Sequence, residues 1–165
     1  MSTNSIIAKK IGRDKYRAIF CKHDGYLADN GWILSKYYTT PERVDKLLDL
    51  GDLYSLSKRL SESEKEAPEE EVTTAYARDK GEKMCPAKEY SLEELYDLEL
   101  PYLYIFVGAD KWVYSGPGEL QEELRDVKKA LKYLEDAEPA EVLLEEEDEE
   151  PIENIDSNSK PTLKL

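Results

Sequence analysis

The acidic residues of this chain are concentrated in two segments, and this limits the part of the sequence that can form a core. The formal net charge is −14 over 165 residues. Residues 135–165 contain twelve Asp and Glu against two Lys, and residues 61–71 contain six Glu against one Lys. Outside these two segments, the rest of the chain has a net charge close to zero. Dense runs of like charge stay solvated, so we expect a nearly uncharged folded body with acidic appendages.

The length and composition suit one globular domain with extensions. We predict a globular domain over residues 1–116, an amphipathic helix over 117–135 and an acidic disordered tail over 136–165. Two cysteines are too few for a disulfide framework, and the chain shows no signal peptide or long apolar run. We therefore expect free thiols and a cytoplasmic location. The negative charge argues against nucleic acid or an anionic membrane as a direct partner.

The first half of the chain predicts a β-hairpin followed by short helices. Strand-like runs over residues 5–11 and 16–22 flank a turn-rich connection. Thr40-Pro41-Glu42 has the order of an N-cap residue, a proline at the first helical position and an acidic first turn. Residues 32–38 and 53–60 also show helical spacing of apolar side chains.

The second half predicts a lone strand, a short helix and a second hairpin. Apolar and polar residues alternate over residues 72–78, and Ser91 with Glu94 matches a capping box. Strand-like runs over 102–107 and 111–115 flank a turn. Together these elements favour an α+β fold. We expect one antiparallel sheet of about five strands, with short helices on one face and a C-terminal amphipathic helix.

The strongest periodic pattern lies between residues 120 and 134. Leucines and one valine recur there at steps of four and three, the spacing of one helix face. Glutamates gather near the start of this stretch and lysines near its end, as the helix dipole favours. The face either packs on the sheet or joins a partner, including a second copy of the chain in a dimer. Its candidate partner-binding residues are Leu120, Leu124, Val127 and Leu131.

The glutamate-rich tail is a second candidate for partner binding. An unbroken acidic run is formed by Glu145, Glu146, Glu147, Asp148, Glu149 and Glu150. Such a sequence either serves only for solubility or imitates the phosphates of a nucleic acid. In the second case it would bind the basic groove of a host nucleic-acid enzyme, and salt would weaken that binding strongly.

A series of motifs is spread over the chain in a recognisable order. Cys21–Tyr26 has the form Cys-x-x-Asp-Gly-Tyr, residues 75–82 have the form Ala-Tyr-x-Arg-Asp-x-Gly-Glu, and residues 102–114 end in a Trp-containing strand. Over about residues 5–115 this order resembles a family of small tailed-phage and prophage accessory proteins. The resemblance implies a phage accessory protein made in the bacterial cytoplasm and implies no particular activity. Family members usually end soon after the Trp-containing strand, so residues 116–165 are an extension.

Charged and aromatic residues at the ends of strands are candidates for a small-ligand site, because loops at strand ends often carry binding groups. The Arg78 guanidinium could hold a phosphate or carboxylate, and Tyr76 or Tyr26 could stack on a ring. The alternative is a local ion pair between Arg78 and Asp79 beside a glycine turn. The candidate ligand-binding residues are Asp24, Tyr26, Tyr76, Arg78, Asp79 and Glu82.

Three residues carry groups that can bind metals or act as nucleophiles. Cys21 and His23 would point to the same side of a strand and could share a metal with Cys85, but a tetrahedral zinc site needs four ligands. A Cys–His nucleophile would need an oriented base and an oxyanion hole, and no motif supplies them. We therefore expect a buried Cys21, no metal, no cofactor and no enzymatic activity.

Two functional hypotheses follow from these observations. The first is a phage accessory protein that binds and inhibits a host protein, either a defence protein or a nucleic-acid enzyme with a basic groove. In this hypothesis the acidic tail contributes electrostatics like those of nucleic acid. The alternative is a protein that binds or sequesters a small, nucleotide-type ligand through the loops at its strand ends.

Overall fold

The computed structural model describes residues 3–64, 70–117 and 124–137. Its contacts divide the chain into two units, Met1–Leu131 and Lys132–Leu165. The first unit contains the sheet described below and the first residues of the last helix. The predicted boundary at residue 116 therefore lies inside this unit.

Both predicted hairpins are present. β1 (Ser5–Gly12) pairs antiparallel with β2 (Lys15–Cys21). β6 (Tyr102–Gly108) pairs antiparallel with β7 (Lys111–Ser115). In each hairpin the turn lies where glycine, alanine, aspartate or lysine residues interrupt the apolar pattern, as such turn chemistry predicts.

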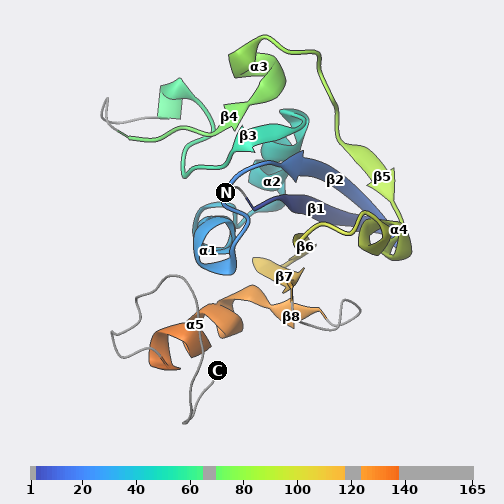
Figure 1. Cartoon of the computed structure of the whole chain (residues 1–165), viewed down its shortest axis with the longest axis vertical. Coiled ribbons are helices and arrows are strands. Elements are labelled where there is room, and N and C mark those ends of the chain that lie inside the picture. Colours follow the sequence, from blue (N-terminus) through green and yellow to red (C-terminus); the bar gives the residue numbers. More distant parts are fainter. Residues whose placement is uncertain (1–2, 65–69, 118–123, 138–165) are drawn as a thin grey trace. The chain divides into compact units, whose positions relative to one another are not determined.

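The described strands form one mixed sheet of eight, in the order β4-β3-β2-β1-β6-β7-β8, with β5 paired to β2 (Figure 1). Its shorter members are β3 (Leu53–Ser55), β4 (Thr74–Ala75), β5 (Lys88–Tyr90) and β8 (Arg125–Asp126). β1 runs parallel to β6, and β2 runs parallel to β3. The α+β class is confirmed, but the prediction of about five antiparallel strands was wrong. The two hairpins join through a parallel contact between β1 and β6, and local sequence patterns do not report such a contact.

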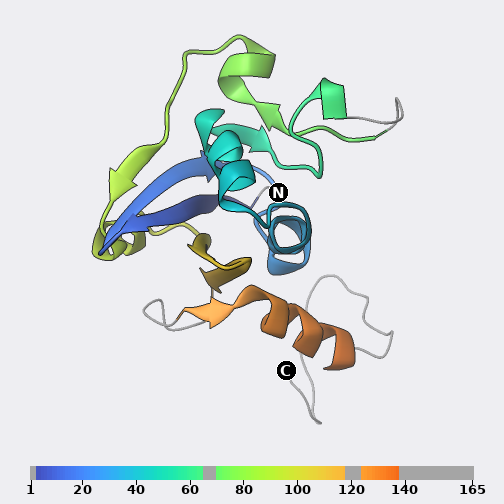
Figure 2. The ribbon, with the colours of Figure 1, turned by 180° about the vertical axis from the view of Figure 1, so that it is seen from behind.

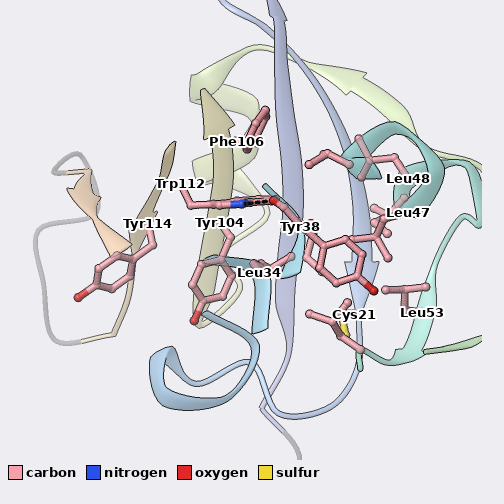
Figure 3. Close-up of a cluster of buried hydrophobic side chains, with 14 of the residues drawn as sticks. Cys21, Leu34, Tyr38, Leu47, Leu48, Leu53, Tyr104, Phe106, Trp112 and Tyr114 are labelled. Carbon is pink, nitrogen blue, oxygen red and sulfur yellow. Dashed lines mark hydrogen bonds between the residues drawn. The ribbon is translucent and has the colours of Figure 1, made fainter. Parts of the chain in front are cut away.

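One face of the sheet carries the larger hydrophobic core. Ile7 of β1 is fully buried in this core, which also contains side chains of α1 (Trp32–Tyr37) and α2 (Pro41–Asp49). Figure 2 shows the ribbons of these two helices, and Figure 3 shows Leu34 of α1 with Leu47 and Leu48 of α2 in the cluster. The indole Nε1 of Trp112 donates a hydrogen bond to the backbone oxygen of Tyr38 at 2.9 Å. This bond ties β7 to the end of α1.

The opposite face carries a second, smaller core. Ile6 and Leu103 are buried there with Leu95 of α4 (Leu92–Asp97). Helices therefore cover both faces, and the prediction of helices on one face was wrong. The reason is visible in β6, where residues 102–106 are apolar at every position, as in strands that are covered on both sides.

Two helices begin where the capping patterns predict. Thr40 Oγ1 accepts the backbone N–H of Arg43 at 3.2 Å, and Pro41 takes the first helical position of α2. Ser91 and Glu94 form the predicted capping box of α4. Ser91 Oγ accepts the Glu94 N–H at 3.1 Å, and Glu94 Oε1 accepts the Ser91 N–H at 2.8 Å.

The predicted helix over residues 117–135 differs from the structure. Within the described residues, β8 pairs with β7, and α5 (Val127–Ala137) begins only after it. Asp126 caps this helix, because its Oδ1 accepts a first-turn backbone N–H at 2.9 Å. Leu124 packs against the smaller core, while Val127 is fully buried in the larger one. Among the described members of the apolar stripe, Leu124 precedes β8 and Val127 begins α5, so these two do not share one helix face.

Two other segments also differ from prediction. Residues 53–60 form β3 and irregular chain instead of a helix, although their three leucines are buried. Residues 72–78 contain the short β4 and then enter α3 (Tyr76–Lys80), which ends at Gly81. The strand β5 was not predicted, because its three residues are largely polar and exposed.

One edge of β2 is shared by two strands. β5 pairs with residues 16–18, and β3 pairs with Cys21. Between these two contacts the backbone N–H of Phe20 donates to Oδ1 of Asp52 at 3.0 Å. A carboxylate therefore satisfies a backbone donor at a point that neither strand covers.

Candidate functional site

A pocket of about 460 Å³ opens beside the end of β2. One side consists of the residues that follow β2 together with α1, and the other side is the segment that follows β3. The polar and aromatic side chains of its lining include Asp24, Asp29, Asn30, Trp32, Tyr37 and Lys58. Arg59, Glu70 and Glu71 also line the pocket.

The chain reverses sharply where β2 ends, and this reversal places the acidic side of the pocket. Asp24 has a positive φ of 59°. Gly25 follows, and a Cβ atom there would lie 2.8 Å from the backbone oxygen of Asn4, so only glycine fits. The π-helix η1 (Leu27–Gly31) then begins, with the Asn30 N–H donating to Asp24 O at 3.0 Å. Single π-helical turns often occur at functional sites.

Asn30 is the buried polar residue of the pocket wall. Its side chain is fully buried, and Nδ2 donates to the backbone oxygen of His23 at 3.0 Å. Longer contacts of 3.5 Å join Nδ2 to Ser5 Oγ and Cys21 Sγ. Within the described residues, Oδ1 is a buried acceptor with no hydrogen-bond partner. Buried acceptors without a partner are rare in folded proteins. Oδ1 has almost no exposed surface, so a ligand in the pocket could contact it only after a local shift of the wall.

Two carboxylates, those of Asp24 and Asp29, stand at the same side. Burial, followed by the charge of Asp24, raises the pKa of Asp29 above its ordinary value. Neither carboxylate forms an ion pair within the described residues. This side of the pocket therefore carries negative charge that the protein itself does not neutralise by direct contact.

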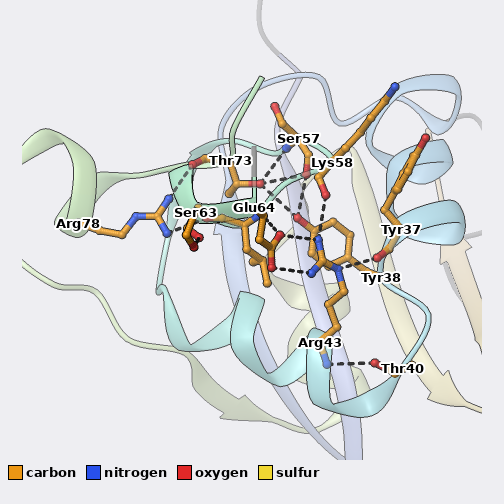
Figure 4. Close-up of polar contacts among 12 residues, drawn as sticks. Tyr37, Tyr38, Thr40, Arg43, Ser57, Lys58, Ser63, Glu64, Thr73 and Arg78 are labelled. Atoms are coloured by element: carbon orange, nitrogen blue, oxygen red, sulfur yellow. Dashed lines mark hydrogen bonds and ion pairs between the residues drawn. The ribbon is translucent and has the colours of Figure 1, made fainter. Parts of the chain in front are cut away.

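From the opposite side, Lys58 lies against two aromatic rings of α1. The Lys58 Nζ lies 5.7 Å from the ring centroid of Trp32 and 5.5 Å from that of Tyr37. The two rings meet edge to face with centroids 5.7 Å apart. Figure 4 shows the Lys58 side chain running alongside Tyr37. A cation over aromatic faces is an attractive arrangement, worth about 0.5–1 kcal/mol at exposed sites.

Arg43 of α2 connects both sides of the pocket (Figure 4). Its Nε donates to Tyr37 O at 2.7 Å, and its Nη2 donates to Lys58 O at 2.9 Å. The guanidinium also forms a two-point contact with Glu64 at 3.0 and 3.1 Å. The hydrogen bonds from Arg43 lower the pKa of Glu64 and outweigh the effect of burial. Arg43 thus fixes the spacing between the end of α1 and residue 58.

Of the predicted ligand-binding residues, Asp24 alone is among the pocket residues named above. Tyr26 is 47% exposed, and its ring meets Tyr102 edge to face at 6.1 Å. Tyr76 contacts Tyr54 edge to face at 5.9 Å. The exposed Glu82 donates its backbone N–H to Tyr76 O. The structure therefore does not bring the predicted set together at this pocket.

Arg78 was predicted to hold an anion, and the structure gives its guanidinium an internal role. Nη1 donates to Leu60 O at 2.7 Å, and Nη2 donates to Thr73 O at 2.8 Å. Nε and Nη2 also contact the Asp79 carboxylate at 2.9 to 3.0 Å. Burial tends to raise the pKa of Asp79, but hydrogen bonds from Arg78 and from the Ala75 N–H lower it. The local ion pair, which was the alternative interpretation, is the one observed.

Cys21, His23 and Cys85 do not form a metal site. Cys21 is fully buried, whereas Cys85 is exposed, and neither is in a disulfide. Burial raises the pKa of the Cys21 thiol to about 12, so it is no nucleophile at neutral pH. His23 packs edge to face against Tyr54 with ring centroids 4.4 Å apart. In the described part of the chain, no group of three or more His, Cys, Asp or Glu residues is placed to hold a metal ion.

The predicted partner-binding residues lie at buried, partly buried and undescribed positions. Val127 is fully buried, and Leu131 packs against the same core. Leu124 packs against the other core. Within the described residues these apolar groups contact the cores of the fold itself, and the dimer contact stays a prediction. Leu120 and the acidic run Glu145–Glu150 lie outside the described residues.

Sequence reasoning did not identify Trp32, Tyr37 or Lys58 as site residues. The first two lie within a predicted helix, and their spacing of five residues is no binding signature. Lys58 reaches them from another segment, so only the folded chain brings the three together. Asn30 was also missed, because it belongs to no sequence motif that indicates a binding site.

Comparisons with protein-family models, with curated proteins and with solved structures found no match. Among the described residues, the helices are all too short or too polar to cross a membrane.

Proposed function

We propose that this protein is a phage accessory protein that binds and inhibits a basic host factor, such as a defence protein or a nucleic-acid enzyme. The resemblance of residues 5–115 supports the phage origin. One observation carries the proposal, namely that residues 135–165 hold twelve acidic residues against two lysines. A polyanion of this density attracts basic surfaces at long range and competes with nucleic acid for them.

The pocket adds acidic groups on the folded body. Its charged lining consists of the acids Asp24, Asp29, Glu70 and Glu71 and the bases Lys58 and Arg59. Arg59 is already near Glu70, with 3.6 Å between Nη2 and Oε2. A basic partner would therefore meet an excess of negative charge on the body as well as in the tail.

The tail's role is tested by neutralising it at constant length. The variant E145Q/E146Q/E147Q/D148N/E149Q/E150Q removes six charges, and a second variant ends after Ala137 so that α5 stays whole. The host factor is captured from lysate and identified, and its affinity for each chain is then measured at low and high salt. We expect both variants to bind more weakly, with a shallower salt dependence. Unchanged inhibition by the neutralised chain would reject the tail's role.

A second candidate function is the binding or sequestration of a small ligand. It is favoured by the pocket, whose volume of about 460 Å³ lies in the range of small-molecule sites. In this case Tyr37→Ala should weaken ligand binding, while neutralising the tail should leave it unchanged. The opposite pattern would favour the host-factor hypothesis. Neither proposal assigns a catalytic activity.

A further inference from the structure

We propose that the pocket between α1 and residues 56–59 binds an organic cation, that is, an ammonium or guanidinium group. This inference rests on the small-ligand proposal and names the chemical class of the ligand. The cation could belong to a free small molecule or to a side chain of a partner protein. Both sources share the same recognition chemistry, and the experiment below separates them.

The acidic side of the pocket supplies the charge for such a ligand. Asp24 and Asp29 lie in the same lining, and neither has a cationic partner within the described residues. A carboxylate accepts charge-assisted hydrogen bonds, and a guanidinium can form two at once. An entering cation would relieve the repulsion between these two groups.

The rings of Trp32 and Tyr37 already hold a cation of the protein itself, the Lys58 ammonium group. Lys58 Nζ lies within 6 Å of the rings of both Trp32 and Tyr37. The pair therefore attracts an ammonium group in the resting protein. Lys58 is an exposed side chain on a flexible stem, so a ligand cation can take its place over the rings.

A third contribution comes from Asn30. Its side chain is fully buried in the same lining, and Oδ1 has no hydrogen-bond partner within the described residues. Ammonium and guanidinium groups carry only donors, so they suit a wall whose unpaired acceptor lies just beneath its surface and becomes reachable after a local shift. A phosphate or carboxylate would carry only acceptors here and would also face the excess of acidic lining residues.

The test uses the full-length protein and a matched series of probes, namely butylguanidinium, butylammonium, neutral butylurea and butyl phosphate. Binding is followed by nuclear magnetic resonance through the Trp32 indole N–H, which is distinguished from Trp112 by a Trp32→Phe variant. This signal reports on the pocket and not on the acidic tail. We expect saturable shifts with the two cations and none with butylurea or butyl phosphate.

Three variants test the site: one should weaken cation binding, one should strengthen it, and one should leave it unchanged. Asp29→Asn should weaken cation binding about fivefold, the loss expected for one exposed charge pair. Lys58→Met should strengthen it severalfold, because the resident cation no longer competes. Glu93→Gln removes an exposed acid from α4, outside the pocket lining, and should change nothing. Equal affinities of wild type, Asp29→Asn and Lys58→Met would overturn the cation site.

The remaining outcomes distinguish the cation site from the broader small-ligand proposal on which it rests. A response to butyl phosphate in place of the cations would overturn the cation class and keep a ligand pocket. If no probe produces a response, both the cation site and the small-ligand proposal are overturned. A capped triarginine peptide is titrated in parallel through the same indole signal. Tighter binding of the peptide than of butylguanidinium would identify a partner's side chain as the source, and equal binding would identify a free small molecule.

Discussion

Replacing Arg43 with alanine should be among the most destabilising single changes outside the core, because four hydrogen bonds of this side chain join three segments. Two backbone oxygens, those of Tyr37 and Lys58, would lose a charged donor, at about 1 kcal/mol each. The two-point contact with Glu64 would add about 1 kcal/mol after allowance for partial exposure. We therefore expect Arg43→Ala to lower the free energy of unfolding by about 3 kcal/mol.

Arg17 provides the matched control. It also forms an ion pair, at 2.7 Å to Asp49, but the Asp49 side chain is 66% exposed and the contact involves one hydrogen bond. Arg17→Ala should cost only about 0.5 kcal/mol. Urea unfolding followed by circular dichroism gives both values. If the free energies of unfolding of the two variants differ by less than about 1 kcal/mol, the connecting role assigned to Arg43 is wrong. Such a difference would be well below the summed energy of the hydrogen bonds that Arg43→Ala removes.

Three further predictions concern other contacts of the fold. The folded-state pKa of Glu64 is lowered, so its contribution is complete above the unfolded pKa and is lost as the pH falls through the folded value. The stability gap between wild type and Arg43→Ala should therefore narrow in acid, as melts at several pH values would show. Asp52→Ala should cost about 1–2 kcal/mol in urea unfolding, because the Phe20 N–H loses its acceptor, whereas Asp52→Asn keeps an acceptor and should cost less. Iodoacetamide should label one thiol in the native chain and two after denaturation, and Cys85→Ser should abolish the native reaction, because Cys21 is buried with a raised pKa. Rapid labelling of both thiols in the native protein would contradict this burial.

The parts of the fold that were predicted correctly depend on interactions between near neighbours. The Thr40 cap, the capping box at Ser91 and the two hairpins all involve residues a few positions apart. The residue types at those positions are sufficient to specify them. The sequence therefore indicated the hairpins and the two capped helices with their positions.

The parts that were not predicted depend on distant residues. The stripe around Val127 has helical spacing, but pairing with β7 makes residues 125–126 a strand, and Asp126 starts the helix later. Tertiary packing also decides which of the predicted ligand-binding residues line the pocket, and of these only Asp24 does so. Arg78 shows the composition of a ligand-binding residue, yet its donors are used by backbone oxygens at Leu60 and Thr73. Which acceptors reach a side chain is decided by tertiary packing.

The parallel contact between β1 and β6 determines how late in synthesis the sheet of this protein can be completed. Ser5 pairs with Tyr102, and Lys9 with Phe106, about 100 positions later. At about 5–20 residues per second, translation of the intervening chain takes about 5–20 s. Throughout that interval the edge of β1 that later pairs with β6 stays open, although α1 and α2 are made early enough to cover one face of the hairpin. We therefore expect the nascent chain to expose this strand edge to chaperones until β6 has emerged from the ribosome.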